Sequence, residues 1–168
     1  LKGLYSSETI DLDSCYETCV RLGEKLRPYV TDVKWILMTA LAGRRPILFA
    51  GAQGTLLDID HGPYPFVTSP NTISGGALPG SGVGEGAIGS VIGIMKAYLT
   101  RVGSGPFPTE IEETEPALAE KIRGIGQEFG ATTGRKRRIG WLDLVALKYA
   151  VEVNGLTGLA LMKADVLN

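Results

Sequence analysis

The fold class is decided by the run Pro46-Ile47-Leu48-Phe49-Ala50, closed by Gly51, and by its counterpart Leu159-Ala160-Leu161-Met162 near the other end of the chain. Both runs are short and wholly apolar. Their length and flanks are typical of strands that are buried on both faces, as in a parallel sheet covered by helices. The two runs therefore predict a sheet in the interior of the protein.

Helical periodicity fills much of the rest of the chain. Apolar residues that recur at spacings of three and four predict helices over 11–27, 30–42, 116–127 and 141–153. A further helix is expected from about Glu85, and alternation predicts a strand over 96–102. Helices interleaved with buried strands give an α/β fold with a mostly parallel sheet and covering helices.

Length and charge limit the class of protein. The 168 residues match one domain, and a net charge of −1 gives no general attraction to nucleic acid or to a membrane. No apolar run is long enough to span a bilayer, and no signal peptide opens the chain. Cys15 and Cys19 are interpreted as buried, reduced thiols, which favours a cytoplasmic location. Because the chain begins with Leu1 rather than Met, we expect it to be a piece of a longer protein.

One loop concentrates positive charge. Gly130-Ala131-Thr132-Thr133-Gly134 leads directly into Arg135-Lys136-Arg137-Arg138. Glycine lets the backbone approach a ligand closely, threonine offers hydroxyls and arginine offers planar forks for oxyanions. This pattern favours a phosphate or carboxylate site; the alternative is a solvated turn that leads into a helix.

Two further segments carry polar groups. Gln53 follows the first predicted strand, where ligands bind in open α/β sheets, although a turn amide bonded to the backbone is an equal alternative. The segment Asp58-Ile59-Asp60-His61-Gly62 is compatible with a hard cation, but hydrogen bonds that orient loops are the favoured interpretation. Lys163 and Asp165 follow the second predicted strand, in the Lys-x-Asp arrangement with which GTPases read guanine. The chain contains no Walker-type phosphate loop.

Longer motifs point to one family. They are Gly51-Ala52-Gln53-Gly54-Thr55-Leu56-Leu57-Asp58-Ile59-Asp60-His61-Gly62, Tyr64-Pro65-Phe66-Val67-Thr68-Ser69, Thr100-Arg101-Val102-Gly103-Ser104-Gly105-Pro106-Phe107-Pro108-Thr109-Glu110, the basic loop with Gly140-Trp141-Leu142-Asp143, and Lys163-Ala164-Asp165-Val166-Leu167. In this order they resemble adenylosuccinate synthetase over nearly the whole chain, most strongly from Ile47 onward.

The resemblance implies a ligase and a fold related to P-loop-type GTP-binding folds. The family uses GTP as co-substrate and Mg2+ as cofactor to phosphorylate the 6-oxygen of IMP, and the amine of L-aspartate then displaces that phosphate to give adenylosuccinate. The family is homodimeric and acts on these small molecules, not on nucleic acid or membranes. Residues 1–168 would be the central part of a single larger domain.

The resemblance also implies roles for individual residues. IMP would be contacted by Gln53, Thr68 and Arg135, and GTP by Arg137, Lys163 and Asp165. The loop that closes over aspartate would comprise Ala131, Thr132, Thr133, Gly134, Arg135, Lys136 and Arg137. Thr132 and Thr133 would lie near the aspartate carboxylates. The charges of Lys136 and Arg138 are interpreted as solvated or structural.

Some family features are absent or altered. The phosphate loop, the catalytic Asp and His and the main Mg2+ ligand of the family belong to an N-terminal part outside these residues, as does an IMP-contacting Arg from the partner subunit. We therefore expect no catalytic residue and no metal ligand in this chain, and no turnover by it alone. The family pattern is changed at Ala50, Pro63, Pro70 and Met162. The alternatives are a non-catalytic anion- or nucleotide-binding module and a degenerate paralogue.

Overall fold

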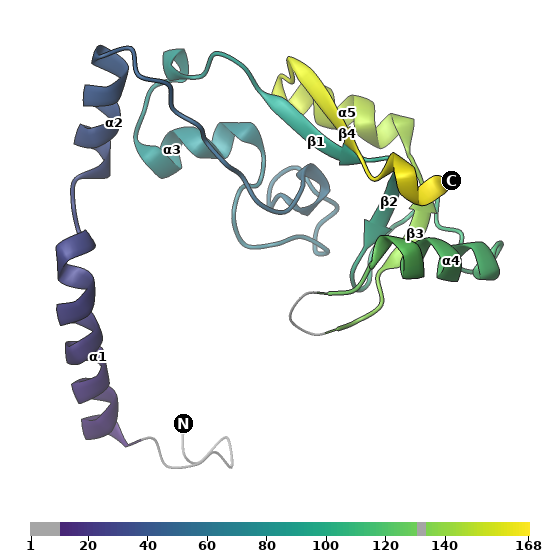
Figure 1. Cartoon of the computed structure of the whole chain (residues 1–168), viewed down its shortest axis with the longest axis horizontal. Helices are drawn as coiled ribbons and strands as arrows, with labels where there is room; N and C mark the ends of the chain where they lie inside the picture. The colour runs from purple at the N-terminus through teal and green to yellow at the C-terminus, as the bar shows by residue number, and fades with distance from the viewer. Residues whose placement is uncertain (1–10, 131–133) are drawn as a thin grey trace.

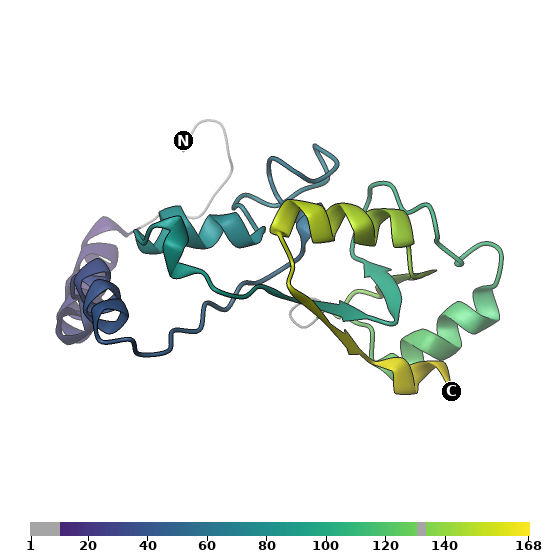
Figure 2. The ribbon, with the colours of Figure 1, turned by 90° about the horizontal axis from the view of Figure 1, so that it is seen from above.

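Two pairs of strands and the helices around them form the thick end of an elongated molecule (Figure 1). The computed structural model describes residues 11–130 and 134–168. Two N-terminal helices, α1 (Leu12–Leu26) and α2 (Val33–Ala42), stand at the other end, away from the strands in both views (Figure 2). The α/β prediction is confirmed.

A parallel pair joins β1 (Ile92–Lys96) to β4 (Gly158–Met162). The apolar run at 159–162 is therefore a strand, as predicted. Its partner β1 contradicts the helix expected from about Glu85, of which only a 3-10 turn, Glu85–Ala87, exists. Gly93 lets β1 lie close to its neighbours, because a Cβ there would lie 2.4 Å from Leu156 Cδ1.

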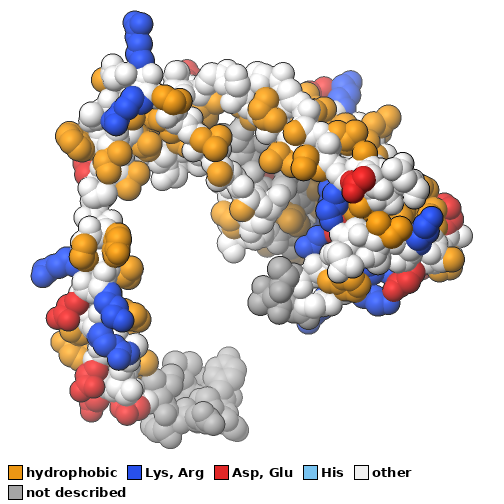
Figure 3. Space-filling model, viewed as in Figure 1, with side chains coloured by type: hydrophobic (Ala, Val, Ile, Leu, Met, Phe, Trp, Pro, Cys, Tyr) orange, Lys and Arg blue, Asp and Glu red, His pale blue; other side chains and the backbone are white. Residues whose placement is uncertain are grey.

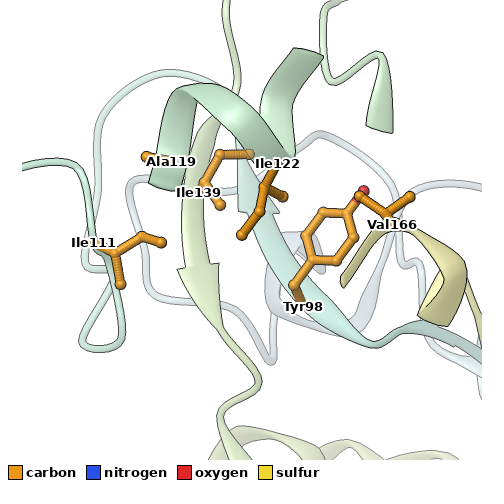
Figure 4. Close-up of a cluster of buried hydrophobic side chains, with 6 residues drawn as sticks. All are labelled: Tyr98, Ile111, Ala119, Ile122, Ile139 and Val166. Carbon is orange, nitrogen blue, oxygen red and sulfur yellow. The ribbon is translucent and has the colours of Figure 1, made fainter. Parts of the chain in front are cut away.

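An antiparallel pair joins β2 (Tyr98–Arg101) to β3 (Arg138–Trp141), and α4 (Pro116–Gly126) packs beside it. The predicted strand at 96–102 and the predicted helix at 116–127 are thus both present. Between these elements lies the main core cluster, shown in Figure 4: Tyr98, Ile111, Ala119, Ile122, Ile139 and Val166. The core joins β2, β3, α4 and the C-terminal 3-10 turn, Ala164–Leu167.

The helix α5 (Leu144–Asn154) lies beside the parallel pair (Figures 1 and 2). The Asp143 carboxylate caps its first turn by accepting from Val145 N and Ala146 N, and Gly155 ends it with a φ of 58°. The predicted start at 141 was too early, because Trp141 belongs to β3. The remaining helix, α3 (Ala77–Ser81), is a short turn.

The run at 46–50 is not a strand, which contradicts the prediction. It belongs to the connector between α2 and the loop that carries Gln53, and Leu48 is 92% exposed. Among the described residues, β1 pairs with β4 and β2 pairs with β3. No strand or isolated bridge in these residues pairs with the run at 46–50. An apolar segment becomes a strand only where a neighbouring strand takes up its hydrogen bonds.

The N-terminal helices α1 and α2 leave apolar side chains uncovered, as Figure 3 shows at the left of the view. No residue of α1 is buried, and Cys15 and Cys19 are exposed, which contradicts the buried thiols expected from the sequence. The spacing did place both thiols on a helix, but the described chain offers no element that covers this helix. In the part of the chain that the structure describes, no helix is long and apolar enough to cross a membrane.

Candidate functional site

A buried carboxylate, that of Glu128, organises the candidate nucleotide site. Its Oε1 accepts from Tyr98 Oη at 2.7 Å, from Lys96 Nζ at 3.0 Å and from Lys163 Nζ at 3.2 Å. Its Oε2 accepts from Arg137 Nη1 at 2.6 Å. We call these five residues the Glu128 cluster. The Glu128 side chain is fully buried, so each of its oxygens is occupied by protein donors.

Local structure places the carboxylate there. Gln127 ends α4 in the left-handed conformation, with a φ of 52°, and the chain turns so that Glu128 points back toward β2. Gly126 makes the approach possible, because a Cβ there would lie 2.4 Å from Tyr98 Oη. The main chain of Glu128 also pairs with Arg137, whose N–H donates to the Glu128 carbonyl at 3.0 Å.

The electrostatics of the cluster favour an ionised Glu128. Burial alone would raise the pKa of its carboxyl, but the hydrogen bonds from Tyr98, Lys96 and Arg137 outweigh burial and lower the pKa to about 2. Burial lowers the pKa of Lys96, and the nearby charges of Arg137 and Lys163 act in the same direction. Burial and the adjacent carboxylate raise the pKa of Tyr98, so its hydroxyl stays a neutral donor. Three cations thus face one carboxylate, which leaves positive charge for an anionic ligand.

Two of the three residues expected to contact GTP, Lys163 and Arg137, meet on this carboxylate. Lys163 begins the C-terminal 3-10 turn with a φ of 58°, and its ammonium also donates to the Gly126 carbonyl. The third expected contact, Asp165, lies exposed in the same turn. Lys163 and Asp165 therefore sit directly beyond the end of β4, where an α/β sheet places its ligands.

Two of the three residues expected to contact IMP, Gln53 and Thr68, also lie together. Gln53 Nε2 donates to Thr68 Oγ1 at 3.2 Å, and Gln53 adopts a φ of 68°. Such a conformation is uncommon for a residue other than glycine and costs about 1 kcal/mol. The Thr68 N–H donates to the Leu57 carbonyl at 2.8 Å, which ties the segment around Thr68 to the earlier part of the loop.

Helix α5 holds that loop in place. Asn154 Nδ2 donates to Thr55 Oγ1 at 2.9 Å, and its Oδ1 accepts from the Ser74 N–H at 2.8 Å. Tyr149 Oη donates to the His61 carbonyl at 3.1 Å. The loop that carries Gln53 is thus anchored to the helix before β4.

Asp58 orders the same loop from inside. Its fully buried carboxylate accepts from the N–H groups of Asp60 and His61 through Oδ1 and from those of Thr72 and Ile73 through Oδ2. Burial would raise the pKa of Asp58, but these backbone donors outweigh it and lower the pKa. The geometry supports the interpretation that this carboxylate orients loops, and it leaves no free oxygen for a hard cation.

The basic loop is only partly described. Ala131, Thr132 and Thr133 lie outside the described residues, so the structure does not place the expected aspartate contacts at these positions. At the base of the loop, Gly130 N donates to the carbonyl of Arg135 at 2.8 Å, and Gly134 has a φ of 63°. The structure therefore places Gly134 and Arg135 on the returning arm of the loop, without assigning either a ligand.

The remaining two cations of the loop make ion pairs. Lys136 Nζ lies 3.1 Å from Glu120 Oε1, and both side chains are exposed. Arg138 pairs with both carboxylate oxygens of Glu110 and donates to the carbonyls of Gly103 and Gly105. Arg138 thus joins β3 to the loop after β2.

Residues able to hold a metal are not grouped. Across 11–130 and 134–168, no three His, Cys, Asp or Glu side chains converge as metal ligands would. The Asp58 and Glu128 oxygens already accept from protein donors, so these two buried carboxylates do not fit a Mg2+ ion.

Sequence reasoning missed Glu128 and Asn154. Glu128 is an acidic residue between the end of a predicted helix and the glycine that opens the basic loop, and it stands next to Phe129. A lone charge in that position is the one sequence signal for a buried carboxylate. Asn154 was interpreted only as part of a helix stop, yet its side chain bonds to two distant segments.

Comparisons with known proteins agree on one family. The family model described as adenylosuccinate synthetase matches residues 1–168. The chain is 55% identical over 168 residues to an adenylosuccinate synthetase of Thermodesulfovibrio yellowstonii and 52% identical to one of Geobacter sulfurreducens. All of this chain is covered in both cases, but only 39% and 38% of the relatives. The chain thus spans about two fifths of the length of the curated relatives that it matches.

Two solved structures have a similar fold. One is the fully ligated adenylosuccinate synthetase of Plasmodium falciparum, with a TM-score of 0.91 and 38% identity, covering 99% of this chain and 38% of that one. The other is the succinoaminodeoxyadenylate synthetase of cyanophage S-2L bound to dGMP and dATP, with a TM-score of 0.65 and 26% identity, covering 83% of this chain and 43% of that one.

Proposed function

The chain belongs to the adenylosuccinate synthetase family, and on this premise we propose that it is the central part of a GTP-dependent ligase. We call the full-length enzyme that contains it the parent protein. The parent protein would join IMP and L-aspartate through 6-phosphoryl-IMP, releasing GDP and phosphate. The observation that carries the proposal is the family match over residues 1–168, at 55% identity to a named synthetase.

The geometry supports two separate groups of binding residues in the chain, one for IMP and one for GTP. Gln53 and Thr68, joined by their hydrogen bond, would contact IMP together with Arg135. Lys163 and Asp165 would bind the guanine of GTP, and Arg137 would lie near its phosphates. These assignments agree with the excess of positive charge in the Glu128 cluster, since phosphates and carboxylates bind best to arginine and lysine donors.

Closure over aspartate is proposed for the loop 131–137. Aspartate brings two carboxylates, and charge-assisted hydrogen bonds to them contribute about 1.5–3 kcal/mol each. A loop that closes only on the bound substrate would exclude water from the reacting atoms. Mg2+ would be held by residues of the parent protein outside this chain, where it would neutralise charge on the transferred phosphoryl group.

A reconstituted assay tests the proposal. The purified parent protein is expected to form adenylosuccinate, detected by chromatography, only when IMP, L-aspartate, GTP and Mg2+ are all present. Replacing GTP with ATP is expected to abolish most product, because Asp165 would accept from guanine donors that adenine lacks. Binding of IMP or GTP without product under any of these conditions would contradict the ligase and favour a nucleotide-binding module.

The 168-residue chain serves as the negative control. It would carry binding residues but no phosphate loop, so we expect no turnover from it under the same conditions. Adenylosuccinate formation by the chain alone would show that the catalytic groups lie within it and would contradict this division. We also propose that the parent protein is a homodimer, which sedimentation equilibrium would test.

A further inference from the structure

We propose that Glu128 is a positioning residue that sets the ammonium of Lys163 and the guanidinium of Arg137 for the guanine nucleotide, one on each carboxylate oxygen. The inference rests on the proposed function, since it assigns a nucleotide to Lys163 and Arg137. Glu128 itself would not touch the nucleotide, because its carboxylate is fully buried behind the two cations.

The contacts divide cleanly between the two oxygens. Oε1 holds Lys163 Nζ at 3.2 Å, and Oε2 holds Arg137 Nη1 at 2.6 Å. Lys163 directly follows β4, whereas Arg137 directly precedes β3, at the end of the basic loop. One rigid carboxylate therefore connects the proposed guanine end of the site to the loop proposed to close over aspartate.

The carboxylate is held independently of those two cations. Tyr98 Oη donates to Oε1 at 2.7 Å and Lys96 Nζ donates at 3.0 Å, from the core strand β2 and the end of β1. Tyr98 is fully buried and belongs to the main core cluster. Tyr98 fixes Glu128, and Glu128 holds Lys163 together with the Gly126 carbonyl, so the position of the lysine is set by the core and not by its own flexible stem.

The residues that hold the two cations are buried, whereas the two cations themselves are partly exposed. The Lys163 side chain is 40% exposed and that of Arg137 is 31% exposed, while Glu128 is fully buried. Long cationic side chains at such exposure lose much conformational entropy when they are fixed for a ligand. A buried carboxylate that holds both cations before the nucleotide arrives reduces that loss, which raises affinity by preorganisation.

Glu128→Gln in the parent protein tests the inference. The amide keeps the size of the side chain but replaces one acceptor oxygen with a donor, so it cannot hold both cations. We expect KM for GTP to rise about ten-fold or more, as for loss of one charge-assisted hydrogen bond, with KM for IMP changed less than about two-fold. A merely structural role would lower the melting temperature without this split between the two substrates.

Glu110→Gln is the matched control. Glu110 is a half-buried carboxylate that ion-pairs with Arg138, the residue after Arg137, but it makes no contact with the Glu128 cluster among the described residues. We expect it to lower the melting temperature less than Glu128→Gln does, because the Glu110 carboxylate is partly exposed, and to leave KM for GTP within about two-fold. If the two variants gave the same KM for GTP, the positioning role would be overturned.

A double-mutant cycle isolates the path through Lys163. If Glu128 acts on GTP partly by holding this lysine, Glu128→Gln should raise KM for GTP clearly less in a Lys163→Ala background than in the wild type. Full additivity would overturn the inference. Should Glu128→Gln fail to fold, Glu128→Asp keeps the charge but withdraws both oxygens by one methylene. It is expected to raise KM for GTP selectively, and an unselective effect on both substrates would overturn the role.

The wild-type assay separates this inference from the proposed function. Absence of GTP-dependent product from the wild-type parent protein would overturn both. A wild-type enzyme that turns over normally, with KM for GTP unchanged in Glu128→Gln, would overturn only the role of Glu128.

Discussion

Gln53 Nε2 donates a hydrogen bond to Thr68 Oγ1 at 3.2 Å, and this bond joins two of the three proposed IMP contacts across a sequence separation of 15 residues. Gln53 adopts a left-handed backbone conformation with a φ of 68°, which directs its side chain toward Thr68. The two side chains therefore act as one unit, since moving either of them removes the partner of the other.

The first prediction concerns that unit. Gln53→Glu replaces the amide donor with a carboxylate, which repels the phosphate of IMP and can no longer donate to Thr68 Oγ1. We expect KM for IMP to rise about ten-fold in the parent protein, with KM for GTP changed less than about two-fold. Steady-state kinetics with each substrate varied in turn measure both constants. Equal changes in the two constants would contradict an IMP site at Gln53.

A second prediction concerns Asp58. In Asp58→Asn, an NH2 group replaces either Oδ1, which accepts from Asp60 N and His61 N, or Oδ2, which accepts from Thr72 N and Ile73 N. Two donors then face each other in a buried site, and we expect the free energy of unfolding to fall by about 3 kcal/mol. Urea denaturation of the parent protein measures the loss. Asp60→Asn is the control, because that carboxylate is exposed and should cost less than about 1 kcal/mol.

The pH dependence of the same carboxyl has a fixed sign. The folded-state pKa of Asp58 lies below its ordinary value, because backbone donors outweigh the effect of burial. Its contribution to stability is therefore fully present above the ordinary aspartate pKa and is lost as the pH falls toward the folded-state value. Asp58→Asn should flatten the fall in unfolding free energy below about pH 4. An equally steep acid slope in wild type and variant would contradict this.

The third prediction compares two glycines. A Cβ at Gly140 in β3 would lie 2.5 Å from Phe107 Cε2 and 2.7 Å from the carbonyl oxygen of Thr109, and the backbone atom cannot easily yield. Gly140→Ala should therefore destabilise the protein by about 1–3 kcal/mol. Gly124 is the matched control: it is exposed in α4, and a Cβ added there would meet no atom within 4 Å, so Gly124→Ala should stabilise by about 0.5–1 kcal/mol. Thermal denaturation of both variants shows whether each substitution raises or lowers the melting temperature.

Local patterns predicted the elements that carry their own signals. The apolar run at 159–162 is a strand, and the helix predicted over 116–127 is present at Pro116–Gly126. The run at 46–50 has the same character as the first but is not a strand. The difference is a pairing partner, which β4 finds in β1 and which the run at 46–50 lacks among the described residues. Strand formation depends on distant residues, and a local pattern does not contain that information.

The residues of the candidate site could also be predicted only where they belong to a local motif. Gln53, Thr68, Arg137 and Lys163 were identified through motifs, and the structure brings them together in two pairs. The residue that joins the second pair, Glu128, had no motif of its own. Its donors Tyr98 and Lys163 lie 30 and 35 residues away, so its burial follows from the tertiary fold alone.

The last prediction concerns the 168-residue chain by itself. Its uncovered apolar side chains include Leu48 at 92% exposure, Val145 at 83% and Ile94 at 79%, on the connector, on α5 and on β1. Contiguous apolar surface and unpaired strand edges promote association. We expect the isolated chain to bind the dye ANS strongly and to sediment as oligomers, whereas the parent protein should bind little dye. Adding 0.5 M NaCl, roughly the range in which ion pairs are screened, should not dissociate these oligomers, because burial of apolar surface drives them. A monodisperse monomer that binds no dye would show that these surfaces are covered within the chain.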